Sequence, residues 1–320
     1  MLAPVGNARG LIGKIEKVRN LLRGGMRSDV IVVAEFSLSY ALVAKAIAVL
    51  TRCRLVVDGF VGLYETDIGD LEKASAVSPR ARVLALLDWC AVVVADLYLI
   101  DTEVRAETIR RRHPSAKVLS LPVGSPSWAV PQPGRKRNGE DSLLRVLYYG
   151  NYIPLHGVDL VIDAIAKSEL RGKVELTLIG DGRTRPEVER RVRAAGVQAA
   201  CRFLEAVPAE KLPDHIRESD VVLGIFGDSL KARSVIANKV WQGLSCGRTV
   251  VTRASPALEE IADVVGDQLI QIGPSSDELA DELLRLHSTG TGGSGFSAAA
   301  EGLEAYVDAC YGRLTAFLRE

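Results

Sequence analysis

The chain alternates between short apolar runs and longer segments in which apolar residues recur at helical spacing. In its first part, this pattern predicts strands at residues 30–34, 54–57, 92–100 and 117–121. Helices are predicted between them at residues 41–50, 78–90 and 105–112. Because continuous apolar strands separated by helices are typical of a parallel sheet covered on both faces, we expect an α/β fold.

A segment rich in proline, glycine and charge interrupts the alternation at residues 122–141 and has the composition of a linker. Beyond it, strands are predicted at residues 144–149, 174–179, 201–204, 221–225 and 249–252. Helices are predicted at residues 158–167, 186–195, 208–217, 238–246, 257–264, 277–286 and 298–318. We therefore expect a first domain (1–125), a linker (126–143), a second domain (144–297) and a C-terminal helix (298–320) that packs back toward the first domain.

The length and charge narrow the possible functions. A chain of 320 residues has room for about two domains. Its 40 Lys and Arg balance 40 Asp and Glu, and only 5% of its residues are aromatic, so we expect no nucleic-acid partner. The five cysteines are scattered without a C-x-x-C pair, which predicts free thiols, no metal site and a cytoplasmic location. No apolar run approaches the roughly 20 residues that a membrane span needs.

The N-terminal segment is basic and amphipathic. Residues 1–27 hold six Lys or Arg against one Glu, and residues 11–22 place apolar side chains at helical spacing. One interpretation is a helix formed by residues 9–27 that lies on an anionic membrane at its inner face. The other is a helix that packs on the next strand with its charged side in solvent.

Ligands of open parallel sheets bind outside the carboxyl ends of the strands, so the loops there carry the candidate chemistry. After the strand ending at residue 149, Gly150, Asn151, His156 and Gly157 form a turn into a helix. Such a turn offers N–H groups to an anion, and His156 could add a proton-dependent positive charge. A tight turn with a surface histidine explains the same spacing.

Two further loops follow strands of the second domain. Gly180 and Asp181 belong to a Gly-Asp-Gly turn, which is common and weak evidence alone. The longer loop carries Lys231 and Arg233 just before a helix that starts near Asn238. Two cations upstream of a helix N-terminus would hold a diphosphate well, although a solvated loop has the same charges.

Together these loops resemble the C-terminal domain of glycosyltransferase family 4 (group 1), retaining nucleotide-sugar transferases of the GT-B fold. The resemblance rests on the following runs: LYYGNYIPLHGV (147–158), LIGDG (178–182), RFLEAV (202–207), DVVLGIFG (220–227), NKVWQGLSCG (238–247) and VVT (250–252). It is strong over residues 145–262 and weaker over residues 29–125. It implies two Rossmann-like parallel-sheet domains that face a cleft.

The resemblance also implies a mechanism. The nucleoside diphosphate binds the C-terminal domain, the acceptor binds mainly the N-terminal one, and the sugar keeps its anomeric configuration. The acceptor class in the family is a glycan or a lipid-linked molecule. No metal and no cofactor beyond the nucleotide-sugar substrate is expected, because helix N-termini and basic side chains stabilise the leaving diphosphate.

Several family positions differ in this chain. The two family glutamates fall on Ser234, which cannot supply a carboxylate to the sugar, and Gln242, which can still hydrogen-bond ribose. The Gly-Arg and Lys-Gly diphosphate contacts fall on Gly150-Asn151 and His156-Gly157, so both cations are lost. We expect three cations near the predicted helix start to compensate: Lys231, Arg233 and Lys239.

The base usually lies against backbone after the strand that holds Phe203, which here points to Glu205 and Val207. In the resemblance, Gly180 and Asp181 also belong to the nucleoside side of the site.

In the first domain, the loop at residues 57–67 follows a strand and concentrates acids. Asp58 and Glu65 suit the hydroxyls of a sugar and are our catalytic candidates there, together with Ser234. A polar loop with a capping aspartate is the alternative. Relatives begin with further strands before the element at residues 30–34, so we expect an incomplete first domain: a misplaced start, a shortened form or a split form.

The main hypothesis is a metal-independent retaining glycosyltransferase of the hexosyltransferase type. The alternative is a catalytically silent nucleotide-sugar-binding or partner subunit, indicated by Ser234, Asn151 and the short first domain. Another GT-B enzyme, such as a nucleotide-sugar epimerase, is a third possibility.

Overall fold

The computed structural model describes residues 28–70, 74–133, 143–291 and 296–319. The predicted N-terminal helix and residues 134–142 of the predicted linker lie outside these residues. The chain divides into two compact units, Met1–Leu121 with Arg313–Glu320, and Pro122–Gly312. Each unit is built around its own parallel sheet.

The first unit holds four described strands in the order β1-β2-β3-β4. They are β1 (Val30–Val33), β2 (Arg54–Asp58), β3 (Leu97–Ile100) and β4 (Val118–Ser120). The helices between them are α2 (Ala41–Thr51), α3 (Pro79–Val94) and α4 (Glu103–Arg112). Because consecutive strands are neighbours and parallel crossovers are right-handed, these helices cover the same face. The opposite face packs Val56 and Leu99 against Leu314 and Phe317, from the end of α11 (Phe296–Arg319).

One predicted strand of this unit was too long. Residues 92–94, expected in a strand, belong to the last turn of α3, and β3 starts only at Leu97. The Ser78 side chain caps the start of α3 by accepting from the Ala81 N–H, at 3.2 Å. An apolar run such as residues 91–95 fits a buried helix as well as a strand, so periodicity alone could not place the boundary.

The second unit holds six described strands in the order β10-β9-β8-β5-β6-β7. They are β5 (Leu144–Tyr149), β6 (Val174–Ile179), β7 (Cys201–Leu204), β8 (Val221–Leu223), β9 (Thr249–Arg253) and β10 (Leu269–Ile272). All the pairings are parallel. The sequence did not predict β10, whose pattern is short and interrupted by Gln271.

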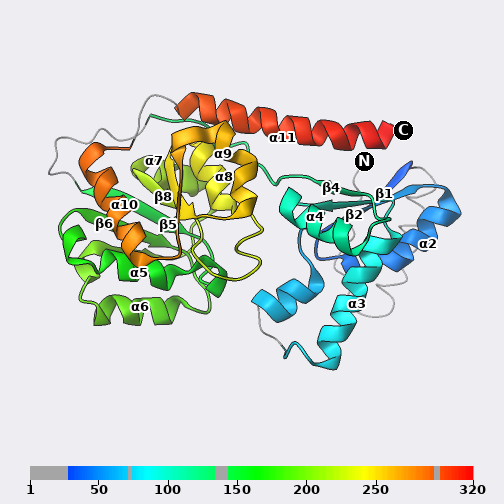
Figure 1. The fold of residues 1–320 in the computed structure, drawn as a ribbon, viewed down its shortest axis with the longest axis horizontal. Coiled ribbons are helices and arrows are strands. Elements are labelled where there is room, and N and C mark those ends of the chain that lie inside the picture. The colour runs from blue at the N-terminus through cyan, green and yellow to red at the C-terminus, as the bar shows by residue number, and fades with distance from the viewer. Residues whose placement is uncertain (1–27, 71–73, 134–142, 292–295, 320) are drawn as a thin grey trace. The chain divides into compact units, whose positions relative to one another are not determined.

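Helices cover both faces of this second sheet (Figure 1). They are α5 (Val158–Ile165), α6 (Arg185–Ala194), α7 (Leu212–Glu218), α8 (Asn238–Ser245), α9 (Glu259–Val265) and α10 (Ser276–Thr289). Side chains of α5, α6 and α10 share one core with the same sheet face. On the other face, Gly243 of α8 lies against Val222 and Val250, too close to leave room for a side chain.

All five cysteines are free, as predicted from their spacing. Within the described part of the chain, no helix combines the length and the apolar character that crossing a membrane requires.

Candidate functional site

The second sheet has a switch point between β5 and β8. The chain leaves β5 toward β6 and β7, whereas it leaves β8 toward β9 and β10, so the connections from β5 and β8 run in opposite directions along the sheet. Such a divergence opens the crevice in which doubly wound sheets bind ligands. The two loops also touch here, since the Phe226 N–H donates to the His156 carbonyl at 3.0 Å and the Gly227 N–H to the Leu155 carbonyl at 3.2 Å.

The glycines at the ends of β5 and β6 bring the two predicted loops together. The Gly150 N–H donates to the Ile179 carbonyl at 3.0 Å. A Cβ on Gly180 would lie 2.1 Å from the Gly150 oxygen, where φ of Gly180 is +127°. Asp181 is exposed, its carboxylate accepts from the Gly182 N–H at 2.7 Å, and its carbonyl accepts from the Tyr152 N–H at 2.9 Å. Gly180 therefore fixes the loop geometry, and Asp181 caps the turn.

His156 is held by its own loop and by β5. Its Nδ1 lies 2.8 Å from the Tyr148 hydroxyl, which donates to the Asn151 carbonyl at 2.9 Å. Burial, and secondly the charge of Lys239, lower the pKa of His156 to about 3. The imidazole is therefore neutral near pH 7, so it does not supply the positive charge that the sequence predicted for it. Gly157, at the start of α5, completes this turn.

Lys239, in the first turn of α8, is almost fully buried, with 4% of its surface exposed. Its Nζ lies 4.1 Å from the centroid of the Tyr148 ring. The same Nζ would lie 3.4 Å from a Cβ on Gly150, which places the ammonium beside that glycine's backbone. It has no hydrogen-bond partner among the described residues, and burial lowers its pKa to about 7. Asn238 starts the same helix, so the predicted glycine turn and helix start do meet.

Gln242 lies one turn after Lys239 on α8. Its Oε1 accepts a hydrogen bond from the Tyr149 hydroxyl at 2.9 Å, and Tyr149 is buried. This bond fixes the amide orientation and leaves the Nε2 hydrogens available to a ligand oxygen. The predicted ribose contact is thus a hydrogen-bond donor, whereas a glutamate would accept.

Charged side chains of the loop after β8 form ion pairs with each other and with Arg253. Asp228 pairs with Arg233 at 2.5 Å and with Arg253 at 2.6 Å. Arg253 is 8% exposed, and its Nη1 donates to the Gly227 carbonyl at 2.7 Å. The Ser234 N–H and hydroxyl donate to the Lys231 carbonyl at 2.9 and 3.2 Å. Arg233 therefore already has a carboxylate partner. Arg253, which was not predicted from the sequence, anchors the loop.

The predicted base-binding stretch follows β7. Glu205 is exposed and pairs with Arg185 at 2.8 Å, and Val207 is half-buried. Arg185 also donates to the Gly180 carbonyl at 2.7 Å and lies over the Phe203 ring, 6.0 Å from its centroid. Arg185 was not predicted, although its place at the start of α6 after the Gly-Asp-Gly turn was a signal. It connects the Gly180 and Glu205 loops.

The first-unit candidates are tied into their own loop. The Asp58 carboxylate accepts from the Phe60 N–H at 3.1 Å. Glu65 pairs with Arg105 at 2.7 Å, and Arg105 pairs with Asp101 at the same distance. These contacts give Asp58 and Glu65 structural roles, while their predicted catalytic roles remain predictions.

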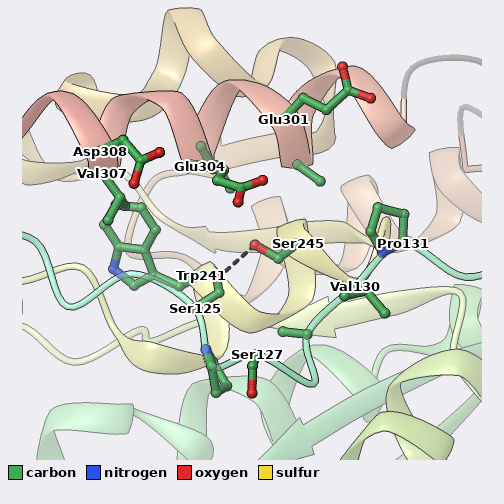
Figure 2. A pocket seen from close by; sticks show the side chains of 14 residues that line it. Ser125, Ser127, Val130, Pro131, Trp241, Ser245, Glu301, Glu304, Val307 and Asp308 are labelled. Atoms are coloured by element: carbon green, nitrogen blue, oxygen red, sulfur yellow. Dashed lines mark hydrogen bonds between the residues drawn. The ribbon is translucent and has the colours of Figure 1, made fainter.

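A cavity of about 350 Å³ lies on the far side of α8 from Lys239 and Gln242. Figure 2 shows Trp241 and Ser245 of α8 facing the acidic side chains of α11 across it. The Ser245 hydroxyl lies 2.7 Å from the Ser125 hydroxyl, and Trp241 stacks on Tyr306 with centroids 6.4 Å apart. No residue of the predicted donor site lines this cavity.

In the described residues, no group of three or more His, Cys, Asp or Glu side chains could hold a metal ion.

Residues 144–289 match the family model described as "Glycosyl transferases group 1". These residues form a group 1 glycosyltransferase domain. The match spans the switch point, both loops that meet there and α8, so the chain is a glycosyltransferase. A comparison with curated proteins finds no match.

Solved structures agree on the fold of this glycosyltransferase. HepE of Anabaena, in complex with UDP and glucose, has a TM-score of 0.67 at 16% identity over 98% of this chain and 84% of that one. The lipopolysaccharide outer core galactosyltransferase WaaB has 0.62 at 16%, over 96% and 80%. Sucrose-phosphate synthase of Thermosynechococcus elongatus has 0.63 at 13%, over 99% and 81%. The predicted GT-B fold is confirmed.

Proposed function

We propose that this glycosyltransferase moves a hexose-type sugar from a nucleoside diphosphate donor to a glycan or lipid-linked acceptor. In this proposal the sugar keeps its anomeric configuration and no metal is required. One observation carries it: within a group 1 domain, a buried cation without a hydrogen-bond partner stands at a helix start, beside a glycine turn at the switch point. HepE, which has the same fold, is seen with UDP and glucose, and this supports a nucleotide-sugar donor.

The roles of the residues follow from their positions. The diphosphate lies along Gly150, Gly157 and the start of α8, where N–H groups and Lys239 neutralise the charge that develops as the sugar leaves. Gln242 donates to the ribose, since Tyr149 occupies its carbonyl oxygen. The base lies against the backbone near Glu205 and Val207. The Ser234 hydroxyl takes the place of the family carboxylate beside the sugar.

The test is donor turnover by the full chain. Sugar conjugates of UDP, GDP and ADP are incubated with the protein and a panel of glycan and lipid-linked acceptors, with and without EDTA. We expect one donor to release nucleoside diphosphate in an acceptor-dependent, EDTA-resistant reaction, and the anomeric configuration of the product to match that of the donor. Absence of both turnover and nucleoside diphosphate binding would overturn the proposal. Inversion of the anomeric configuration would overturn only the proposed retention. Sensitivity to EDTA would overturn only the proposed metal independence.

A second function has a specific observation in its favour. Ser234 lacks a carboxylate, and its hydroxyl is bonded to the Lys231 carbonyl at 3.2 Å. A subunit that binds a nucleotide sugar for a catalytic partner would tolerate this change. Tight binding of the diphosphate together with no transfer to any acceptor would favour this function over the first.

A further inference from the structure

The surroundings of the Lys239 ammonium are neutral. From β5 it meets the ring of Tyr148, from the following loop it approaches His156, and on its own helix Gln242 lies one turn away. His156 is uncharged near pH 7, and burial is the single cause that lowers the pKa of Lys239. No carboxylate among the described residues offsets that cost. An ammonium buried without a counter-charge is costly, and its neutral form is favoured.

Three other cations near the site already have carboxylate partners. Arg233 and Arg253 share Asp228, and Arg185 pairs with Glu189 and Glu205. Of these four basic side chains, Lys239 is the one that lacks a carboxylate in the described structure. Its Nζ adjoins the backbone of Gly150, in the glycine turn assigned to the diphosphate.

We propose that the donor diphosphate is the counter-charge that Lys239 lacks, and that its binding draws a proton from solvent onto the Lys239 Nζ. This inference rests on the proposed function. The proton joins the lone pair of the neutral amine as the diphosphate enters, and it returns to solvent when the nucleoside diphosphate leaves. No other bond forms or breaks in this step.

The pH dependence follows from the charges. Before the diphosphate binds, the pKa of Lys239 is about 7, so the amine is half protonated near pH 7. A bound diphosphate favours the charged form and raises this pKa. Proton uptake should then be about one half per diphosphate at pH 7 and approach one at pH 8.5. Between these pH values the affinity should fall about 16-fold, because a smaller fraction of the unliganded protein carries the proton.

Titration calorimetry on the full chain tests this directly. UDP, GDP and ADP are the probes, and each is titrated in buffers of different ionisation enthalpy from pH 7 to pH 8.5. The second phosphate pKa is about 6, so the ligand itself is almost fully ionised over this range. We expect the binding enthalpy to change with the buffer in proportion to the proton taken up, and the affinity to fall with pH. Uridine, which has no phosphate, should show neither effect.

Variants separate Lys239 from the other groups. Lys239→Met should remove the proton uptake and weaken the binding of UDP at pH 7. In Lys239→Arg, the affinity for UDP should not fall between pH 7 and pH 8.5. Lys211→Met removes an exposed lysine of the turn Ala209–Lys211 and should behave as the wild type. Circular dichroism shows whether each variant is folded.

The possible results are distinguishable. UDP binding with no proton uptake and a flat pH profile would overturn this inference and leave the proposed function standing. Wild-type proton uptake and pH dependence in Lys239→Met would also overturn this inference and leave the proposed function standing. No binding of any diphosphate, together with no turnover, would overturn the proposed function itself.

Discussion

A single substitution at Gly180 should disturb the loops that follow β5 and β6. In Gly180→Ala the new methyl would lie 2.1 Å from the Gly150 oxygen and 3.0 Å from its carbonyl carbon. Both are backbone atoms, and the ladder between β5 and β6 holds them in register. The methyl therefore fits only if the Gly150 turn moves by about 1 Å, the gap to normal van der Waals contact.

The magnitude has two parts. A φ of +127° is a region that side chains rarely adopt, and holding alanine there costs about 1–3 kcal/mol. Forcing a methyl into filled space costs a further 1–3 kcal/mol or so. We therefore expect Gly180→Ala to lower the free energy of unfolding by about 2–6 kcal/mol.

Gly172 provides a matched control, since its φ is +70° and no atom lies within 4 Å of the Cβ position. Gly172→Ala should show the backbone cost alone, about 1–2 kcal/mol. Urea denaturation of both variants measures the difference, and UDP calorimetry shows whether the Gly150 turn has moved. Equal losses of stability in the two variants, with unchanged UDP affinity in Gly180→Ala, would refute the reasoning.

Four other variants test neighbouring contacts. Lys239→Met should be more stable than the wild type at pH 7, and the gap in unfolding free energy should narrow by about 2 kcal/mol at pH 9. The reason is that a pKa lowered to about 7 makes the unfolded wild type bind more protons than the folded one, so wild-type stability rises with pH; a constant gap in urea titrations would contradict this. Tyr149→Phe should weaken uridine and UDP equally in calorimetry, by about 1 kcal/mol, because Gln242 loses its orienting bond; a loss confined to UDP would show that Gln242 serves the phosphates. Arg253→Met should lower the free energy of unfolding by about 1–3 kcal/mol in urea titrations, because the buried Arg253 bonds the Gly227 carbonyl. Arg233→Met breaks an exposed ion pair and should lower it by less than about 1 kcal/mol. The reverse order would mean that Arg233 anchors the loop.

Much of the fold could be predicted from the pattern of apolar residues, because they are continuous in buried strands and recur at helical spacing in helices. The sequence also placed the loops at Gly150 and Phe226 after strands of one parallel sheet, but the switch point between them became clear only from the strand order. The prediction failed where the pattern was short or ambiguous. β10 has only four residues, one of them Gln271, and residues 92–94 suit a helix and a strand equally.

Residue types pointed to the candidate site, but the ionisation states of its side chains could not be predicted from the sequence. A sequence counts Lys239 and Arg233 as equal cations, yet one is buried without a carboxylate and the other is paired with Asp228. His156 fits a phosphate site by type, but burial keeps it neutral. Burial and pairing depend on contacts between residues far apart in the chain, such as Arg185 with Glu205, so spacing could not reveal them.

Helix α8 links the proposed donor site to a tryptophan. Lys239 and Gln242 serve one side of the helix, and Trp241 lies between them in the chain with only 1% of its surface exposed, stacked on Tyr306. An eight-residue helix moves nearly as a single object, so any shift when the diphosphate arrives or departs must also alter the packing of that indole. In a variant with Trp89 and Trp128 replaced by Phe, Trp241 emission should therefore report occupancy of the proposed donor site in real time, without a label and without altering a residue assigned to the substrate.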